Sequence, residues 1–571
     1  MKRDRFFWVL PIILAVAIAF FPSQVLSQSP GTTINREVVG TVLDPLGQPV
    51  EAAHVTLRNV TKDEVLAEAD TQPDGSYLLD LPNPQNSLEP ANQLQVHVER
   101  AHFEATTLLL NTSELMALVS DQALIVPQIN LTWSIDASFW VATGVFILML
   151  VLIATGLLQN TLAALFGASL IFAFSYLGSS VRKDLFIFGF QRAMEYVDWN
   201  VIFLVMGMMI VIAVVERTGI FQWLAFMAYR LSGGRIWLLV PILMIFTGIA
   251  SAFLDNVTTM LLMTPITVQI ALSLAVSPLA LLVPEVLASN VVGISTLIGT
   301  PTNILIGSFA RISFADFLTN LTPGVLLALL GLIIYSEWVY RQELKPGEEK
   351  EVPEALVEKL EEQAQITEPE QLKKAGVIGA SMLLLFIFGE HVHLLPSVTA
   401  LMGATALLVW IRPDIEEMIE AVDWTTLVFF IALFIVVGGV QEVGLISVIA
   451  ENIGKLVGKN LILAILVVIW FSALFSMVVA NIPFTAAMLP VIAYLSATIP
   501  GATNKVLFYG LSIGSAMGGN GTLIGASANM VTAGISDRAG YPLTYAYFFK
   551  KGFPALLVTV TIGTLWILFH F

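Results

Sequence analysis

The sequence contains no cysteine, and charged residues make up only 12% of its 571 residues. The first absence excludes disulfide bonds, thiolate metal sites and a cysteine nucleophile. The second sets the chain apart from soluble globular proteins, in which about a quarter of the residues are charged. Because 56% of the residues are hydrophobic and apolar runs of about 18 residues or more recur, we expect most of the chain to lie in a lipid bilayer.

Acidic residues outnumber basic ones, and the formal net charge is −16. This balance gives no indication of nucleic acid as a partner. Ten acidic and six basic residues fall within residues 341–375, where large apolar side chains are few. The composition of this segment predicts a solvated acidic linker between two more apolar regions.

The N-terminal residues 1–28 have the pattern of a signal peptide. Lys2, Arg3 and Arg5 form a positively charged start, and residues 6–21 form an apolar core. An uncleaved membrane anchor is the alternative, because the cleavage point is not sharply defined. Under both interpretations, we expect the segment that follows to be exported.

Residues 35–131 have the pattern of a small β-sandwich. Residues 38–43 alternate between apolar and polar side chains, residues 53–58 form a second such run, and Asp74-Gly75 predicts a hairpin turn. Short strands at this spacing are typical of a sandwich. The pattern resembles the carboxypeptidase regulatory-like domain, which implies a binding or spacer module without catalytic residues.

The apolar part of the chain carries an internal duplication. The Asn256 of the first half recurs as Asn481, with the spacing that also relates Asp198 to Asp423. The tetrapeptide Thr-Leu-Ile-Gly then occurs at residues 296–299 and again at residues 522–525. Two related membrane halves with polar interruptions at matching places are typical of secondary transporters.

The duplication predicts a polytopic α-helical membrane protein. Its first transport repeat covers residues 138–340, and its second covers residues 376–571. Residues 236–272 and 461–497 are long apolar segments with a central polar break, so we expect each to form a re-entrant hairpin. Five spans then remain in each half, and this odd number inverts the second half relative to the first. With the β-domain outside the cell, the acidic linker is cytoplasmic.

Asp255 is the most informative single residue of the apolar part. A carboxylate at the centre of a membrane helix costs roughly 2.5–3.5 kcal/mol, so it needs a cation, a proton or water. It could bind a cation directly or alternate between a proton and sodium, and the alternative is that it only caps the hairpin tip. The matching residue of the second half is Ala480. Other candidate residues at the two tips are Asn256, Thr258, Asn481 and Thr485.

The segments 289–303 and 515–529 place glycine and hydroxyl residues in the middle of a spanning run. Gly299-Thr300-Pro301 should break the first helix, and the glycines at 518–521 should break the second. Freed carbonyl groups suit sodium and half-helix N-termini suit an anion, whereas close helix packing is the structural alternative. The candidate site residues here are Gly299, Thr300, Asn303, Asn520, Thr522, Ser527 and Asn529.

The motifs at residues 254–259 and 298–303 resemble those of the ion transporter superfamily. Within it, residues 138–571 are most similar to the group of arsenite permeases, NhaD-type sodium–proton antiporters and P protein, which has a citrate-transporter-like domain. The resemblance implies a homodimer in which a mobile transport domain slides against a scaffold, as in an elevator. It also implies a sodium site at Asp255, Asn256 and Gly299. Dicarboxylate carriers of the superfamily have Ser-Asn-Thr at the tips, and an acid there argues against citrate or succinate.

We therefore expect a secondary transporter in the plasma (inner) membrane, with its N-terminal domain extracytoplasmic. Sodium–proton antiport through Asp255 is the first hypothesis, with sodium or a proton as coupling ion and no organic cofactor. Efflux of arsenite or another small anion, and carriage of an organic or amino acid, are the alternatives within transport. A membrane receptor or sensor is the non-transport alternative. An enzyme is not expected, because Asp255 has no partner carboxylate and a His-Glu-x-x-His pattern is missing.

Overall fold

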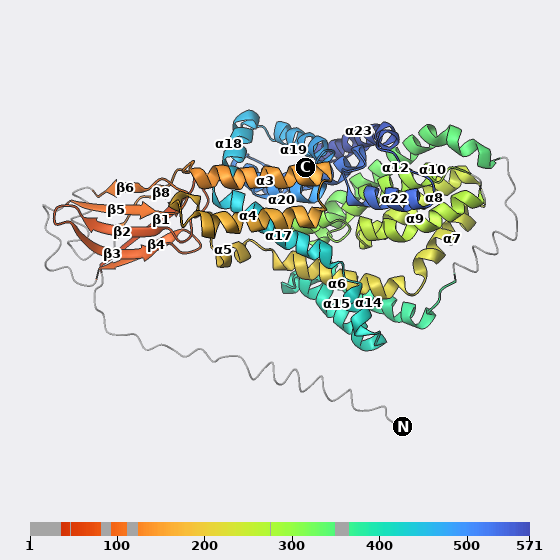
Figure 1. Cartoon of the computed structure of the whole chain (residues 1–571), viewed down its shortest axis with the longest axis horizontal. Helices are drawn as coiled ribbons and strands as arrows, with labels where there is room; N and C mark the ends of the chain where they lie inside the picture. The colour runs from red at the N-terminus through yellow and green to blue at the C-terminus, as the bar shows by residue number, and fades with distance from the viewer. Residues whose placement is uncertain are drawn as a thin grey trace, which may run out of the picture. The chain divides into compact units, whose positions relative to one another are not determined.

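The computed structural model describes residues 36–45, 47–81, 93–110, 124–233, 235–274, 276–348 and 365–571. The predicted signal peptide or anchor at residues 1–28 lies outside these residues. Two compact units can be distinguished (Figure 1). The first holds the β-strands up to residue 131, and the second holds residues 102–104 together with the helices from residue 132 onward.

The β unit contains two sheets. One has the order β4-β1-β7, with β8 also paired to β1, and the other has the order β3-β2-β5-β6. The strands are β1 (Arg36–Leu43), β2 (His54–Asn59), β3 (Glu64–Asp70), β4 (Ser76–Leu81), β5 (Leu94–Glu99), β6 (Thr106–Leu109), β7 (Leu124–Ile125) and β8 (Ile129–Asn130). Along β2 and β5 every second side chain is buried, so one face of this sheet forms part of the core of the unit.

Glycine makes room for the largest side chain of this core. Tyr77 on β4 lies opposite Gly40 on β1, and a Cβ atom on Gly40 would stand 2.4 Å from the Tyr77 hydroxyl. The Tyr77 ring is therefore packed across the Gly40 backbone. Burial raises the pKa of Tyr77 to about 12, because the phenolate form would lose its hydration.

The prediction of a hairpin at Asp74-Gly75 is wrong, although the turn itself is present. Gly75 has a φ of +75°, and Asp74 Oδ1 accepts a 3.0 Å hydrogen bond from the backbone of Ser76. The turn joins β3 to β4, which belong to different sheets and pair with β2 and β1 respectively. Turn residues determine where the chain reverses, but they do not determine which strands pair on either side of the turn.

The helical unit has two series of helices, and ten of its described helices are long and apolar enough to cross a bilayer. The first series is α3 (Ala137–Thr155), α4 (Asn160–Ala173), η1 (Phe174–Gly178), η2 (Lys183–Leu185), α5 (Phe190–Glu195), α6 (Trp199–Glu216), α7 (Ile220–Ser232), α8 (Ile236–Phe253), α9 (Asn256–Ser273), α10 (Leu279–Val292), η3 (Gly293–Ser295), α11 (Pro301–Ala310) and α12 (Phe314–Glu348). The second is α14 (Pro369–Phe388), η4 (Gly389–Val392), α15 (Pro396–Ile411), α16 (Ile415–Glu420), α17 (Trp424–Glu442), α18 (Leu445–Val457), α19 (Leu461–Ser476), α20 (Asn481–Thr498), η5 (Ala502–Asn504), α21 (Val506–Gly518), η6 (Gly519–Gly521), α22 (Ser527–Arg538) and α23 (Tyr545–His570).

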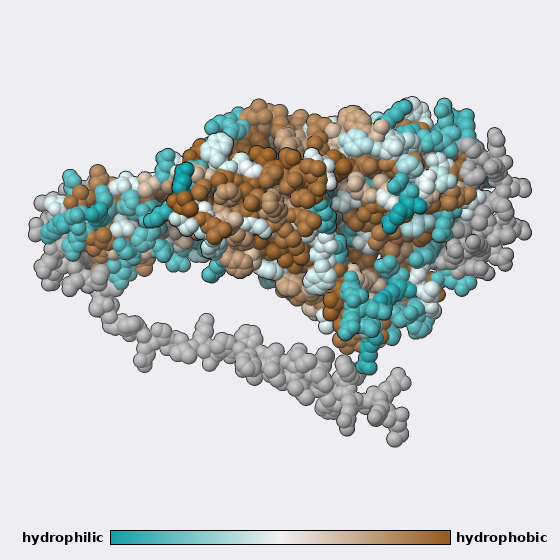
Figure 2. Space-filling model, viewed as in Figure 1, coloured by the Kyte–Doolittle hydropathy of each residue, from teal (hydrophilic) through white to brown (hydrophobic). Residues whose placement is uncertain are grey.

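Apolar side chains cover much of the helical unit. On the face in Figure 2, hydrophobic residues form a broad area over this unit. Trp140 of α3 and Phe166 of α4 are among its exposed large apolar side chains. A surface of this kind suits contact with lipid, in agreement with the ten helices of spanning length.

The order and lengths of the helices recur in the two series. The hairpin helices α9 and α20 both have 18 residues, and the interruption α10–η3–α11 is matched by α21–η6–α22. Gly219 and Gly444, with φ of +77° and +83°, make the matching turns before α7 and α18. Backbone geometry thus follows the sequence duplication, whereas inversion of the second half and re-entrant hairpins stay predictions.

Helices of each series pack against helices of the other series. Within a series, α8 packs on α10 and α19 packs on α21. Between the series, α9 packs on α22, and α20 packs on α11. Each hairpin therefore lies against the broken helix of its own half and against the final part-helix of the other half. This arrangement brings the polar interruptions of both halves into one region of the fold.

The helices extend into the predicted acidic linker. Helix α12 continues to Glu348 and α14 begins at Pro369, while residues 349–364 lie outside the described chain. Glu343 explains why the first end is helical rather than a solvated loop. Its carboxylate lies 3.0 Å from Lys551 Nζ and accepts a 2.6 Å hydrogen bond from the Tyr547 hydroxyl, both on α23.

Candidate functional site

Asp255 stands between α8 and α9 and caps the second helix. Its Oδ1 accepts hydrogen bonds from the backbone of Val257 (2.9 Å) and Thr258 (3.0 Å), and its Oδ2 accepts one of 2.5 Å from the Thr258 hydroxyl. The same pattern occurs at the exposed start of α17, where Asp423 accepts from the backbone and hydroxyl of Thr426. Capping is thus one role of Asp255 and Thr258, and the helix N-terminus stabilises the negative charge.

The second hairpin tip lacks this cap. Ala480 stands at the equivalent position before α20 and offers no side-chain acceptor. Thr485, one of the predicted site residues, donates a 2.7 Å hydrogen bond to the carbonyl of Asn481 in its own helix. The side chain of Asn481 is 6% exposed and has no hydrogen bond to any other described residue. The two tips therefore have matching helices, but their side chains differ in chemistry.

A buried chain of amides connects the first hairpin tip to the second half. Asn256 Nδ2 donates to Asn290 Oδ1 at 2.8 Å. Asn290 Nδ2 in turn donates to Asn520 Oδ1 at 2.9 Å and to Asn529 Oδ1 at 3.0 Å. Asn520 Nδ2 donates to the carbonyl of Leu287 at 3.2 Å. Three predicted site residues are thus brought together, and the residue that joins them, Asn290, was missed by the sequence analysis.

Asn303 and Asn529 each stabilise the helix break of their own half. Asn303 Nδ2 donates to the carbonyl groups of Ile294 (2.9 Å) and Thr296 (2.8 Å), and its Oδ1 accepts a 2.5 Å hydrogen bond from Ser512 of the other half. Asn529 Nδ2 makes equivalent bonds of 2.8 and 3.0 Å to two carbonyl groups of the second break. Part of the backbone freed by each break is therefore satisfied by an amide of the following part-helix.

Threonine hydroxyls attach each break to the hairpin of its own half. Thr296 donates to the carbonyl of Ala252, and Thr522 donates to that of Met477 at 2.5 Å. Both carbonyl groups belong to residues at the end of the first hairpin helix, shortly before the tip. The matched bonds give Thr522 a structural role in the second half that no sequence pattern alone could assign.

Gly299, Thr300 and Ser527 lie where the part-helices begin. A Cβ atom on Gly299 would stand 2.4 Å from the carbonyl oxygen of Gly293, so only glycine fits the close approach of these backbone segments. Thr300 caps α11 by accepting a 3.2 Å hydrogen bond from the backbone of Asn303. Ser527 begins α22 and is partly exposed.

The sodium site at Asp255, Asn256 and Gly299 stays a prediction. Both carboxylate oxygens of Asp255 accept hydrogen bonds from α9, and the Asn256 amide donates to Asn290. Across the described residues, no group of three or more His, Cys, Asp or Glu side chains is arranged to hold a metal ion. A sodium ion bound here would have to use carbonyl, amide and hydroxyl oxygens in addition to one carboxylate.

Glu285 is a second residue that the sequence analysis missed. It lies on α10, it is fully buried, and its Oε1 accepts a 2.9 Å hydrogen bond from the Thr247 hydroxyl of α8. An acid inside an apolar run is a visible sequence feature, but the second half has no acid at a matching place. Glu285 is therefore not part of the duplicated pattern of polar residues.

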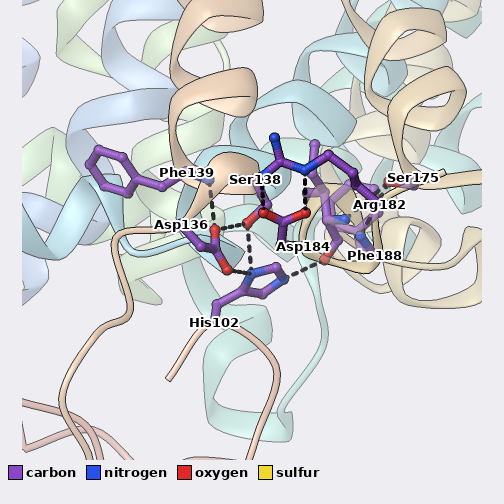
Figure 3. A network of polar contacts seen from close by, with 9 residues as sticks. His102, Asp136, Ser138, Phe139, Ser175, Arg182, Asp184 and Phe188 are labelled. Carbon is purple, nitrogen blue, oxygen red and sulfur yellow. Dashed lines mark hydrogen bonds and ion pairs between the residues drawn. The ribbon is translucent and has the colours of Figure 1, made fainter. Parts of the chain in front are cut away.

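A separate polar network lies at the start of α3 (Figure 3). Ser138 Oγ donates to Asp136 Oδ1 at 2.5 Å and lies 2.9 Å from His102 Nδ1, while His102 Nε2 lies 2.8 Å from the carbonyl of Ile187. In a catalytic triad the histidine lies between the serine and the acid. Here Ser138 donates its hydroxyl proton to Asp136 rather than to the histidine, His102 Nδ1 also lies 4.0 Å from Asp136 Oδ2, and His102 Nε2 lies against the carbonyl of Ile187. The network therefore fastens residues 102–104 to the helices and does not form a nucleophilic site.

The model of the citrate transporter family (CitMHS) matches residues 147–509, which is more than half of the chain. The chain belongs to the citrate transporter family. The predicted membership of the ion transporter superfamily is thereby confirmed, and this family member is a multi-pass membrane transporter.

Relatives of this citrate transporter family member include other transporters. An uncharacterised transporter of Mycobacterium tuberculosis is 33% identical over 428 residues, which cover 75% of the chain and 97% of that protein. The human P protein is 31% identical over 511 residues, covering 76% of the chain and 60% of P protein. Among solved structures, the YdaH transporter of Alcanivorax borkumensis matches with 14% identity and a TM-score of 0.47, over 75% of the chain and 97% of that chain. The resemblance of the β unit to the carboxypeptidase regulatory-like domain stays a prediction.

Proposed function

We propose that the protein is a cation–proton antiporter, with sodium as the first cation to test, that works by elevator-type alternating access. The observation that carries the proposal is the buried amide chain from Asn256 through Asn290 to Asn520 and Asn529. It joins the hairpin tip of one half to the helix break of the other. Membership of a transporter family and the matched interruptions of the two halves support the same interpretation.

The charges around this region favour a cation over a carboxylate substrate. Asp255 lies at the first tip, and Glu285 is buried in the helix that precedes the first break. The two tips and two breaks, residues 254–259, 289–303, 479–485 and 515–529, contain no lysine, arginine or histidine. A di- or tricarboxylate would have no cationic side chain there to offset its charge, whereas a small cation would meet acids and amide oxygens.

Transport of a small uncharged or oxyanion-like solute, such as arsenite, is the second candidate. The side chain of Asn481 favours it, because this nearly buried amide has no partner among the described residues and offers both a donor and an acceptor. Under this alternative, expression should raise the tolerance of cells to arsenite, and added sodium should have little effect on transport.

The test of antiport uses inverted membrane vesicles with a preformed pH gradient. Added sodium should dissipate the gradient with wild-type protein, and Asp255→Asn should abolish this effect. Asp198→Asn is the matched control, because Asp198 caps the start of α6 by accepting hydrogen bonds from the backbone of Asn200 and Val201. Loss of exchange in the first variant alone supports a role for Asp255 beyond capping. Equal, normal exchange in both variants would show that the acid at the tip is only a cap.

Orientation and assembly belong to the same proposal. We place the protein in the plasma membrane with the β unit outside the cell, and we expect a homodimer in which the scaffold helices of two copies meet. Cross-linking of the detergent-solubilised protein followed by mass measurement tests the dimer, and protease digestion of intact cells tests the exposure of the β unit.

A further inference from the structure

Glu285 has one carboxylate oxygen without a partner among the described residues. The side chain is fully buried on α10, and Oε1 accepts the hydrogen bond from Thr247. Oε2 has no hydrogen bond to any described residue. An ordinary structural carboxylate would have both oxygens bonded, because a buried acceptor without a partner costs about 1–3 kcal/mol, and more when it is charged.

Threonine hydroxyls of α9 are available to this carboxyl group. Thr267 faces it without a hydrogen bond of normal geometry, and Thr264 lies one turn earlier on the same side of α9. Both hydroxyl oxygens are buried and unpaired among the described residues. In contrast, Thr259 and Thr485 on the hairpin helices donate to the carbonyl four residues earlier, as membrane threonines commonly do.

No basic side chain compensates a charge on Glu285. It forms no ion pair within the described residues, and α8 and α9, which pack against α10, carry no titratable side chain. The other elements packed against α10 that carry titratable groups are α12, α21, α22 and α23. Their described titratable groups are Asp316 and several within residues 335–345, Tyr509, Asp537, Arg538, several within residues 545–551, and His570, and none is bonded to Glu285.

Protonation of Glu285 would both neutralise the buried carboxylate and give Oε2 a hydrogen-bond partner. A proton on Oε2 removes the uncompensated charge and supplies a donor for the Thr267 hydroxyl, which then has a partner too. Asp255 differs from Glu285 in its hydrogen bonds, since both of its oxygens accept at the N-terminus of α9, whereas Oε2 of Glu285 has no partner among the described residues.

We propose that Glu285 is the proton-binding site of the exchange cycle, with Thr247 and Thr267 as the residues that position its carboxyl group. The carboxyl releases one proton to water on the side to which the site opens and takes one up on the other side, and no other bond changes. Its role in exchange rests on the proposed antiport, whereas the presence of a protonated buried carboxyl at this place does not.

The first test detects the proton directly. Infrared spectra of the purified full-length protein at neutral pH are compared between wild type and Glu285→Gln. The difference spectrum should contain the C=O absorption of a protonated carboxylic acid, shifted in Thr267→Val and unchanged in Thr267→Ser. Glu442→Gln is the control, because Glu442 is also buried but lies 3.2 Å from Arg192 Nε and should show carboxylate bands only. Carboxylate bands in the Glu285 difference spectrum would overturn the proposal.

The second test separates proton coupling from cation binding in proteoliposomes. Glu285→Gln preserves the shape of the protonated side chain, so sodium–sodium exchange should continue while sodium-driven proton movement is lost. Normal proton movement in this variant would show that Glu285 is a permanently protonated structural residue. If wild-type protein moves no protons with sodium although the infrared band is present and titrates, antiport fails and the proton site stands.

Discussion

Asn256 donates a 2.8 Å hydrogen bond to Asn290, and this contact fixes the first hairpin tip to the helix that precedes the first break. The equivalent contact is missing in the second half because Ala516 follows Ser515 where Asn290 follows Ser289. Asn481 consequently has no side-chain hydrogen bond to any residue that the structure describes. Of the two matching tip asparagines, Asn256 thus has a bonded side-chain amide and Asn481 has none among the described residues. This difference makes the two half-sites chemically unequal.

Replacing Asn290 by alanine should both destabilise the protein and stop transport. The change removes the partner of Asn256 and two donors to Asn520 and Asn529, all of them buried. Each orphaned buried amide group should cost about 1–3 kcal/mol, so a clear fall in Tm is expected. Asn452→Ala is the control, because Asn452 is exposed and bonds only to a carbonyl of its own helix. A wild-type Tm and exchange rate in Asn290→Ala would contradict the assigned role.

Glycine at position 299 is required by the close approach of backbone segments. In Gly299→Ala the new Cβ would lie 2.4 Å from the carbonyl of Gly293 and 2.7 Å from that of Ser251, and neither backbone atom can rotate away. Overpacking of this kind costs about 1–3 kcal/mol. Gly534→Ala on α22 is the matched control, since its Cβ would meet nothing within 4 Å and should raise stability slightly. Thermal unfolding of both variants measures the difference, and equal Tm values would refute the packing argument.

The same residues indicate how far the sequence could be interpreted. The duplication predicted Asn256 and Asn529, whose counterparts are Asn481 and Asn303, because polar residues that recur at one spacing in apolar runs are improbable by chance. Asn520 was predicted from the glycine-rich second break instead. Asn290 and Glu285 could not be found in this way, since neither has a polar counterpart in the other half. Their roles depend on which helices become neighbours, and that is decided by tertiary packing.

Local sequence patterns likewise predicted helix caps and turns correctly, but they did not predict which strands pair. The capping of α9 by Asp255 follows a spacing of acid and threonine that is visible in the sequence, as it is at Asp423. The turn at Asp74-Gly75 was also predictable. Its assignment to a hairpin was wrong, because β3 pairs with β2 and β4 pairs with β1, and neither partner is adjacent to the turn in the sequence.

The β unit should show a pH-dependent contribution from His54. A 2.9 Å hydrogen bond to Asp70 raises the pKa of His54 above its ordinary value of 6.5, with smaller effects from neighbouring acids. Since the folded-state pKa is raised, the contribution to stability is fully present below pH 6.5 and is lost as the pH rises through the folded-state value. His54→Gln should therefore lower the Tm of the β-unit transition in acid more than in alkali.

Asp70→Asn supplies the control for the histidine. It removes the hydrogen-bonded acid, so the difference in Tm between acidic and alkaline solution should shrink in the same direction as in His54→Gln. The effect should be small, because Asp70 is largely exposed to water and His54 is only half-buried. Identical pH profiles of wild type and both variants would contradict the linkage.

The central claim is that the two halves have opposite orientations, so that their breaks meet in one site, and side-specific labelling tests it most directly. The chain has no cysteine, so a single introduced thiol is the only target for a membrane-impermeant maleimide. Arg230 and Lys455 are exposed basic residues in the last turns of α7 and α18, which occupy matching places in the two series. Arg230→Cys and Lys455→Cys should react from opposite sides of the membrane. Labelling of both from the same side would contradict it.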